Sequence, residues 1–458
     1  MFFKQIMVPG MGCYSYVIGC PAAKIMAVVD PKRDVRDYLD IAREEGMKIT
    51  HIFNTHVHAD HISGDQELRS QTGAQIHIHE SAPVDYPHTP LKEGDVYTFG
   101  SARMEVIHTP GHTPNSVSLL VTDTMRSQDP WMILTGDLLF VGDIGRPDLP
   151  GAEILDEQVA NLYDSLYNKL AKYPDHLEVF PAHGQGSLCG KGMSSKGSST
   201  LGYERHANPM LRFADFDSFK ASVMAEFPAR PKSFSHIINT NLKGAPLLVR
   251  CPVDQAMNPD RFAQEIEAGA VVIDTRDAAA FGGMHIPGSL SIGFEKQIAN
   301  WVGMVVEPGS HLLLVVNGTE DYERMTTILH RIGYDDVYGY LLGGMQSWVF
   351  SGRPVRSLPQ VSVVDLAERL KSGNIRLVDV RTPAELKGGI IKGAEHHSLA
   401  DVLDNGLDIA PHENVVVYCG SGYRSNIVAS SLQQNHCCNV SSLAGGVFAW
   451  TSAGMDLE

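Results

Sequence analysis

Seven histidine and aspartate residues stand where apolar runs of the chain end, and their types and spacing are those of metal ligands. They are His56, His58, Asp60 and His61, which form an H-x-H-x-D-H cluster, and His112, Asp137 and His183, each beside a glycine. Because side chains alternate along an extended segment, His56 and His58 project to the same side, and Asp60 and His61 can turn toward a neighbouring position as a helix starts. Imidazoles and carboxylates that converge from strand ends suit a transition-metal site.

A second reactive pattern lies near the carboxyl end, where the apolar run VVVY leads into Cys419, Gly420, Ser421, Gly422, Tyr423 and Arg424. Backbone N–H groups of such a glycine-rich turn, the positive end of the helix expected over NIVASSLQQ, and the Arg424 guanidinium would all lower the thiol pKa. They would also hold a terminal sulfane sulfur. A single cysteine after a strand is more often a buried apolar residue. The Gly-Ser-Gly turn and Arg424 favour the reactive interpretation.

The elements that must position these groups alternate in type through the first half of the chain. KIMAVVD and THIFNT are expected strands on either side of an amphipathic helix over VRDYLDIAREE. Further strands are predicted at QIHIH, RMEVIH, SVSLLV, WMILTGD and LEVFPAH, with a long helix from Glu153 to about Lys172. His77 and His79 alternate within QIHIH, but no turn presents them, so we interpret them as ordinary strand residues. The Gly- and Ser-rich stretch 184–200 is either a linker or a loop on the substrate side.

An internal repeat organises the second half. VVIDTRDAAAFGGMHIPGSLSI is echoed by LVDVRTPAELKGGIIKGAEHHSL, and a Gly-Gly pair followed by Trp occurs in both copies. The repeat sets Asn317 opposite Cys419 and Tyr322 opposite Arg424, so the first copy lacks both nucleophile and cation. We therefore expect three α/β domains, at 1–245, 255–355 and 358–458. The middle domain should be catalytically silent and serve as a spacer, docking surface or dimer contact.

Composition limits the classes of partner. The 458 residues carry a formal net charge of −16, which works against nucleic acid or an anionic membrane surface as partner. Hydrophobic content is 43% and no stretch is long or apolar enough to span a bilayer. Pro9, Gly10 and Gly12 interrupt the amino-terminal stretch, so it lacks the continuous apolar core of a signal peptide and we do not expect it to be one. Seven cysteines without framework spacing indicate reduced thiols, and a cytoplasmic protein is expected.

The metal-ligand pattern resembles the metallo-β-lactamase superfamily over roughly the first 240 residues, which implies an αββα sandwich. In hydrolases of that superfamily, such as glyoxalase II, all seven ligands hold two zinc ions that activate water. In its persulfide dioxygenases, the resemblance implies one Fe(II) per chain, held by His56, His112 and Asp137. The residues that would then orient ligands and substrate are His58, Asp60, His61 and His183. The ligand set alone leaves both alternatives open.

One segment bears on the choice between them. The run from Phe140 to Leu149 resembles the dioxygenases, in which Arg146 would hold an anionic thiol substrate. The alternative is a simple turn with a surface arginine. Cys189, shortly past His183, would either hold or relay substrate sulfur or be a loop cysteine without a role.

The carboxyl-terminal copy resembles the rhodanese family, whose α/β domains contain parallel sheets. The resemblance rests on Asp379-Val-Arg381, on the loop from Cys419 to Arg424, and on Gly445-Gly446 before Trp450. Related phosphatases place one more residue between Cys and Arg, which suits phosphate. The four intervening residues here favour sulfur.

Together these resemblances predict an enzyme with two linked activities. The oxygenase would oxidise the sulfane sulfur of a low-molecular-weight thiol persulfide with O2 to sulfite, and Cys419 would pass a second sulfane sulfur to sulfite, giving thiosulfate. We expect a homodimer. One rival hypothesis is a dizinc thioester hydrolase with rhodanese-like regulatory modules. Another treats the carboxyl-terminal half as a sulfur carrier that docks partners without turnover.

Overall fold

A computed structural model describes residues 1–248, 255–295, 297–410, 412–435 and 439–458. The chain divides into two compact units, one made of Met1–Cys251 with Ile328–Gly333, the other of Pro252–Thr327 with Tyr334–Glu458. The join expected between the first two domains, at 246–254, includes residues 249–254, which lie outside the described residues. Among the described residues, no helix has the length and apolar character needed to cross a bilayer.

The first unit contains two six-stranded sheets. The strands of one, in spatial order, are β1 Phe2–Val8, β2 Cys13–Cys20, β3 Ile25–Val29, β4 Lys48–Phe53, β5 Gln75–His79 and β6 Thr89–Leu91. Those of the other are β12 Ser199–Thr200, β11 Glu178–Pro181, β10 Met132–Gly136, β9 Val117–Asp123, β8 Ala102–His108 and β7 Val96–Phe99. The helices are α1 Arg36–Glu44, α2 Asp65–Thr72, α3 Leu155–Asp164, α4 Leu201–Ala207, α5 Phe216–Met224 and α6 Ser233–Lys243.

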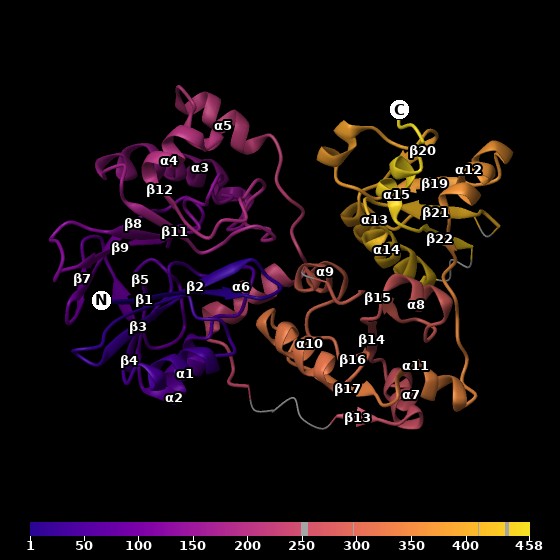
Figure 1. Cartoon of the computed structure of the whole chain (residues 1–458), viewed down its shortest axis with the longest axis horizontal. Coiled ribbons are helices and arrows are strands. Elements are labelled where there is room, and N and C mark those ends of the chain that lie inside the picture. Colours follow the sequence, from indigo (N-terminus) through magenta and orange to yellow (C-terminus); the bar gives the residue numbers. More distant parts are fainter. Residues whose placement is uncertain (249–254, 296, 411, 436–438) are drawn as a thin grey trace. The chain divides into compact units, whose positions relative to one another are not determined.

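The two sheets pack face to face, and helices cover both outer faces (Figure 1). Tyr16, Phe53, Leu119 and Leu134 belong to one buried cluster, to which both sheets contribute. Separate apolar clusters lie under α1 and α2 on one side and under α3 and α5 on the other. This is the expected αββα sandwich, in which each sheet buries one face against the other and one against helices.

Two local expectations differ from the structure. The helix after the H-x-H-x-D-H cluster begins only at Asp65, so an irregular turn rather than a helix presents Asp60 and His61. The expected long helix is α3 followed by a π-helical turn over Ser165–Lys169 and a 3-10 turn over Leu170–Lys172. In both places a hydrophobic pattern fixes which side is buried without fixing the hydrogen bonding of each turn.

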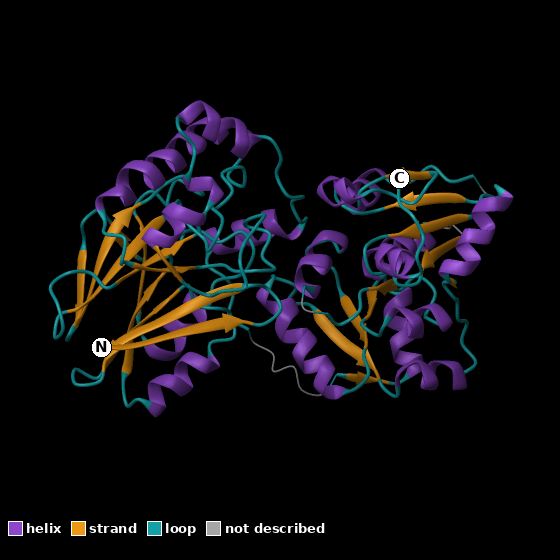
Figure 2. Cartoon of the chain, turned by 45° about the horizontal axis from the view of Figure 1, so that its top comes forward, coloured by secondary structure: helices purple, strands orange, loops and turns teal. Residues whose placement is uncertain are grey.

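The second unit contains two parallel five-stranded sheets with helices around them (Figure 2). The middle domain comprises β13 Ala256–Met257, α7 Pro259–Glu267, β14 Val271–Asp274, α8 Ala278–Gly283, β15 Leu290–Ser291, α9 Ile298–Val305, β16 Leu312–Val315, α10 Thr319–Arg331, β17 Val337–Leu341 and α11 Gly344–Phe350. The last domain comprises β18 Gln360–Val361, α12 Val363–Ser372, β19 Arg376–Asp379, β20 Ala394–His396, α13 Leu399–Asn405, β21 Val415–Tyr418, α14 Tyr423–Gln434, β22 Val440–Leu443 and α15 Gly446–Ser452.

The repeated Gly-Gly pair has a structural cause in the last domain. Gly445 and Gly446 have φ values of 70° and 54°, which favour glycine. A Cβ on Gly446 would lie 2.2 Å from the carbonyl oxygen of Cys419. The pair therefore lets the start of α15 pass directly beside the loop that carries the cysteine.

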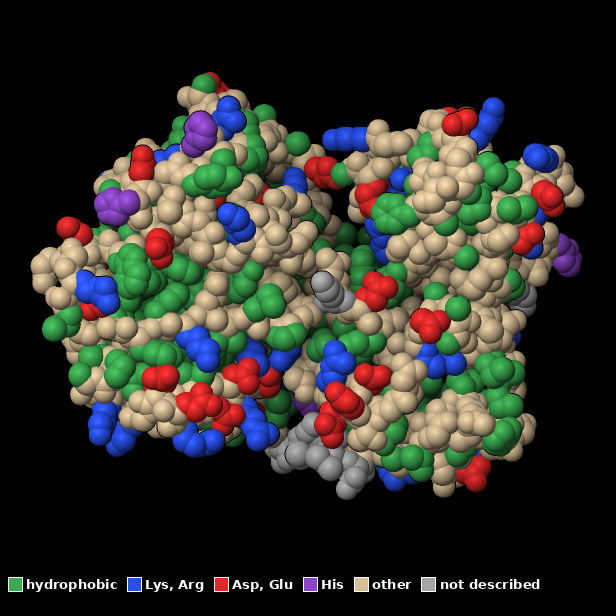
Figure 3. All heavy atoms as spheres, viewed as in Figure 1, with side chains coloured by type: hydrophobic (Ala, Val, Ile, Leu, Met, Phe, Trp, Pro, Cys, Tyr) green, Lys and Arg blue, Asp and Glu red, His purple; other side chains and the backbone are tan. Residues whose placement is uncertain are grey.

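Charged side chains of both signs are interspersed on the face of the molecule that Figure 3 shows, without a continuous basic stripe on that face. This distribution agrees with the net charge of −16.

Candidate metal centre and sulfur-transfer loop

His56, His112 and Asp137 converge at one buried point, each from a loop that follows a strand. Their ligand atoms all lie within 4.8 Å of one another. Asp137 Oδ2 lies 3.4 Å from His112 Nε2 and 3.8 Å from His56 Nε2, and it has no hydrogen-bond partner although it is buried. A buried carboxylate oxygen without a partner is costly unless a cation completes its environment. The three side chains therefore fit a metal ion between them.

The protonation of the three groups also suits a metal. Burial lowers the pKa of His56 and of His112, so both rings are neutral and can donate a lone pair. Although burial opposes ionisation of Asp137, the neighbouring His183 outweighs it and lowers the pKa of that carboxyl. Two neutral imidazoles and one carboxylate are thus preset at neutral pH, with no proton to displace.

His183 lies between two carboxylates. Its Nδ1 is 2.5 Å from Asp137 Oδ1, and its Nε2 is 2.7 Å from Asp60 Oδ2. Burial alone would lower the pKa of His183, but the two aspartates outweigh it and raise that pKa well above the usual value. His183 therefore fixes the orientation of Asp137 through Oδ1, while Oδ2 is the oxygen nearest to His56 and His112.

A second buried cluster adjoins the first and contains a residue that the sequence did not indicate. Cys13, Asp60, His61 and His183 also place one ligand atom each within 4.8 Å. The Cys13 thiol donates to Asp60 Oδ2 at 3.0 Å, and burial raises its pKa to about 12. The structure thus brings together three of the four residues expected beside the triad, with Cys13 in addition.

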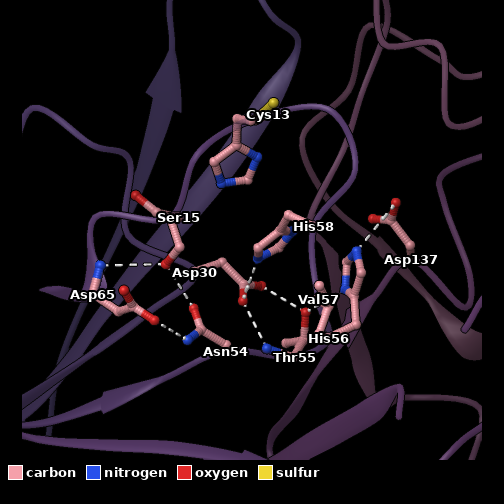
Figure 4. Close-up of polar contacts among 12 residues, drawn as sticks. Cys13, Ser15, Asp30, Asn54, Thr55, His56, Val57, His58, Asp65 and Asp137 are labelled. Carbon is pink, nitrogen blue, oxygen red and sulfur yellow. Dashed lines mark hydrogen bonds and ion pairs between the residues drawn. The ribbon is translucent and has the colours of Figure 1, made fainter. Parts of the chain in front are cut away.

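The fourth, His58, is held by an aspartate that sequence reasoning also missed. Asp30 Oδ1 lies 3.1 Å from His58 Nε2 and accepts the backbone N–H of Thr55 at 2.7 Å, while Oδ2 accepts the Thr55 hydroxyl at 2.8 Å (Figure 4). His58 Nδ1 is buried without a partner. Asp30 follows strand β3 with a φ of 49°, a conformation in which Asp and Asn are enriched. An aspartate that ends a buried apolar run was the available signal.

Arg146 and Cys189 both lie near the triad, Arg146 through its backbone carbonyl and Cys189 through its side chain. The Arg146 guanidinium pairs with Asp148, with Nε at 2.7 Å and Nη2 at 2.6 Å from its carboxylate oxygens. The Arg146 carbonyl oxygen lies 2.8 Å from His112 Nδ1, so the backbone of this segment orients a triad imidazole. The buried Cys189 forms a third close group with Asp137 and His183, within 4.8 Å, and burial raises its pKa well above the usual value.

The loop after β21 surrounds the Cys419 sulfur. Cys419 is fully buried, and the backbone N–H of Gly422 donates to its Sγ at 3.2 Å. Gly422 has a φ of 96°, which turns that N–H inward, and α14 begins at the next residue. Ser425 Oγ lies 3.7 Å from Sγ. This geometry is a cradle for negative charge on sulfur.

Arg424 is paired with Glu385, which the sequence analysis did not single out. Its Nη1 and Nη2 donate to the two Glu385 oxygens at 2.7 and 2.6 Å. Although partial burial opposes ionisation of Glu385, Arg424 and the Thr382 N–H outweigh it and lower its pKa from 4.5 to about 2. Burial disfavours the guanidinium, but Glu385 and the Cys419 sulfur outweigh it and raise the pKa of Arg424. In the middle domain Asn317 is exposed, and Tyr322 is buried against Tyr340.

Two families match the chain. The metallo-beta-lactamase superfamily matches residues 8–183, and the rhodanese-like domain matches residues 258–351 and 362–453. These matches confirm the predicted fold class and both predicted family resemblances.

Among curated proteins, the mitochondrial persulfide dioxygenase of Mus musculus is 27% identical over 256 residues, covering 53% of this chain and 88% of that protein. The hydroxyacylglutathione hydrolase of Rhodospirillum rubrum is 31% identical over 175 residues, covering 37% of this chain and 61% of that protein. A crystal structure of a metallo-beta-lactamase from Staphylococcus aureus is 31% identical, covers 74% of this chain and 98% of that chain, and superposes with a TM-score of 0.68.

Proposed function

Because the chain belongs to the metallo-β-lactamase superfamily and ends in two rhodanese-like domains, we propose that it is a persulfide dioxygenase fused to a sulfurtransferase. Residues 1–245 would oxidise a low-molecular-weight persulfide. Residues 255–355 form the silent domain, and residues 358–458 transfer sulfane sulfur. The similarity to a curated persulfide dioxygenase over 53% of the chain supports the first assignment.

The observation that carries this proposal is the buried triad of His56, His112 and Asp137, with an unpartnered carboxylate oxygen at its centre. Fe(II) held by two imidazoles and one carboxylate would supply an open face for a persulfide sulfur and O2. His183 holds Asp137, and the Arg146 carbonyl orients His112. In the net reaction, the persulfide R–S–SH, O2 and water would give the thiol R–SH, sulfite and two protons. O2 would be the oxidant and would supply two of the sulfite oxygens, water would supply the third, and the carrier sulfur would take up a proton as the S–S bond breaks.

The sulfurtransferase step uses Cys419. Its thiolate attacks the outer sulfur of a persulfide R–S–SH, the S–S bond breaks, and R–S⁻ leaves as the thiol after taking up a proton. Sulfite then attacks the sulfur held on Cys419, which releases thiosulfate and restores the thiolate. The Gly422 N–H and the start of α14 stabilise the sulfur anion before and after each transfer.

Metal quantification with oxygen uptake tests this function. We expect about one iron per chain after anaerobic purification, and O2 consumption that depends on glutathione persulfide. Asp137→Ala should remove both iron and O2 uptake while leaving sulfur loading of Cys419 intact. Protein that contains zinc and consumes no O2 with persulfide would refute the proposal.

A dizinc hydrolase is the second candidate, and the cluster of Cys13, Asp60, His61 and His183 beside the triad favours it. Two adjacent sets of ligands can hold two metal ions that activate water. The similarity to a curated hydroxyacylglutathione hydrolase points the same way. Two zinc ions per chain with thioester cleavage would support this candidate against the first.

A further inference from the structure

A cavity of about 560 Å³ opens between the middle and last domains, inside the second compact unit. From the last domain it is lined by Ser421 and Gly422 of the sulfur-transfer loop, and from the middle domain by Asn317, the residue at the position of the missing cysteine. The volume lies in the range of small-molecule sites, about 300–1,000 Å³. The active loop and its silent counterpart therefore line one cavity.

The cavity lies at the carboxyl edges of both parallel sheets. Thr275 and Asn317 follow β14 and β16 in the middle sheet, and Ser421 and Gly445 follow β21 and β22 in the last sheet. Ligands of open α/β sheets bind outside the carboxyl ends of the strands. Both domains consequently present their binding edge to the same space, although only one of them carries a nucleophile.

The middle domain also holds the helix that starts at the sulfur-transfer loop. The Tyr423 hydroxyl donates to the Gly293 carbonyl oxygen at 2.7 Å, and the Ser291 N–H donates to Ser430 Oγ at 3.0 Å. Further along α14, Gln434 Nε2 donates to the Gly288 carbonyl oxygen at 2.6 Å. These contacts run along α14 from its first residue to its last, so the domain fixes the position of the loop relative to the cavity.

The charges of the lining indicate which carrier the cavity accepts. Asp277 and Glu295, both from the middle domain, are the charged residues among the described residues that line it, and the remainder of that lining is neutral. Two carboxylates attract an ammonium group and repel phosphate groups. The Ser291 hydroxyl and the Asn317 amide can bond to polar groups of a ligand.

We propose that the silent domain is the carrier-binding half of the sulfurtransferase site, and that its ligand is a persulfide of a small aminothiol with a free ammonium group. This inference rests on the proposed sulfurtransferase activity and deepens it. The carrier's ammonium group pairs with Asp277 and Glu295, while its outer sulfur is delivered to Cys419. Transfer breaks the carrier's S–S bond, forms the S–S bond on Cys419, and returns the carrier thiolate to the cavity, where it takes up a proton.

The test is single-turnover loading of Cys419 in the full-length protein without oxygen, followed by mass spectrometry, so that persulfide oxidation does not interfere. Cysteamine persulfide, a small aminothiol persulfide with a free ammonium group, and coenzyme A persulfide are the two donors. We expect the half-saturating concentration of cysteamine persulfide to rise about tenfold in the double variant Asp277→Asn, Glu295→Gln, which corresponds to about 1.4 kcal/mol. Asp277 caps α8 by accepting the Ala280 N–H, and Asn keeps that role.

Glu320→Gln is the matched control, because Glu320 is an exposed acid of the same domain outside the cavity lining. It should leave loading unchanged. Tyr423→Phe removes the bond to the Gly293 carbonyl oxygen but keeps the ring that lines the cavity, so it should lower the loading rate at saturation more than it raises the half-saturating concentration. If the half-saturating concentration were unchanged in the double variant, or equal for both donors in the wild type, the role given to the silent domain would be wrong. The proposed sulfurtransferase activity would not be affected by that result. A wild-type chain that loads from neither donor would refute the sulfurtransferase activity itself.

Discussion

Asp30→Asn should weaken metal binding by acting on two histidines at once. Asp30 accepts from His58 Nε2, which leaves His58 Nδ1 free, and it accepts the Thr55 hydroxyl, whose oxygen lies 3.0 Å from His56 Nδ1. With its hydrogen directed to Asp30, Thr55 Oγ1 can only accept from His56 Nδ1–H. The Nε2 atom of His56 is then free to face Asp137. One carboxylate thus selects the tautomers of both rings.

The Asn side chain has nearly the same shape as that of Asp, and Asn tolerates the φ of 49° at this position. Its amide N–H would compete for the Thr55 oxygen, leaving the hydroxyl hydrogen without an acceptor. One lost charge-assisted bond in a buried network costs about 2 kcal/mol of unfolding free energy. Loss of such an outer partner typically lowers metal affinity about 10–100-fold. Chemical denaturation would measure the change in the free energy of unfolding, and titration with a chelator of known iron affinity would measure the change in metal affinity.

Asp65→Asn is the matched control. Asp65 is equally buried and accepts from Asn54 Nδ2 at 2.9 Å (Figure 4) and from the Tyr86 hydroxyl at 3.1 Å, and neither partner belongs to the triad. It should lose stability and keep its metal affinity. If the metal affinity of Asp30→Asn equalled that of Asp65→Asn, Asp30 would not support metal binding by selecting the tautomers of the two histidines.

Three further outcomes are expected. Cys419→Ser should abolish thiosulfate formation and leave persulfide-dependent O2 uptake unchanged, as an oxygen electrode and thiosulfate assay would record. Glu385→Gln should lower the free energy of unfolding of the last domain by about 1 kcal/mol at pH 7, a value discounted for the partial exposure of the pair with Arg424. Because folding lowers the pKa of Glu385 from 4.5 to about 2, this stabilisation is present above pH 4.5 and is lost as the pH falls through about 2. Denaturation curves of wild type and variant should therefore converge at that pH. Cys13, whose pKa is about 12, should resist alkylation in the folded protein at pH 8 and react after unfolding, as peptide mapping would show.

The sequence indicated seven possible ligands because each follows a strand, and strand ends meet at one edge of the sandwich; the choice of His56, His112 and Asp137 among them came from the resemblance to persulfide dioxygenases, and the structure brings these three side chains together. His56, His112 and Asp137 could be placed together without knowing the register of any strand pair. Asp30 and Cys13 could not, because their contacts depend on how β2 and β3 lie beside the turn that follows β4. Register between strands is set by packing on both faces, which one sequence leaves open.

Glu385 illustrates the same limit in the last domain. It lies in a 3-10 turn after β19, and only the order β22-β21-β19-β20 brings that turn beside the loop after β21. The repeat in the sequence predicted two related domains without indicating which strands are neighbours. Partners of an arginine across such a sheet therefore become visible only once the topology is known.

The pairing of Arg424 changes the account of how the Cys419 thiolate is stabilised. Glu385 offsets part of the positive charge that Arg424 presents to the sulfur, because its two carboxylate oxygens accept from both guanidinium nitrogens. The Gly422 N–H at 3.2 Å and the first turn of α14 add a stabilisation that Glu385 does not offset. Backbone dipoles do not change with pH or with the charge of the carrier. In the proposed sulfur transfer, this would stabilise the Cys419 sulfur anion both when a persulfide approaches it and when sulfite does.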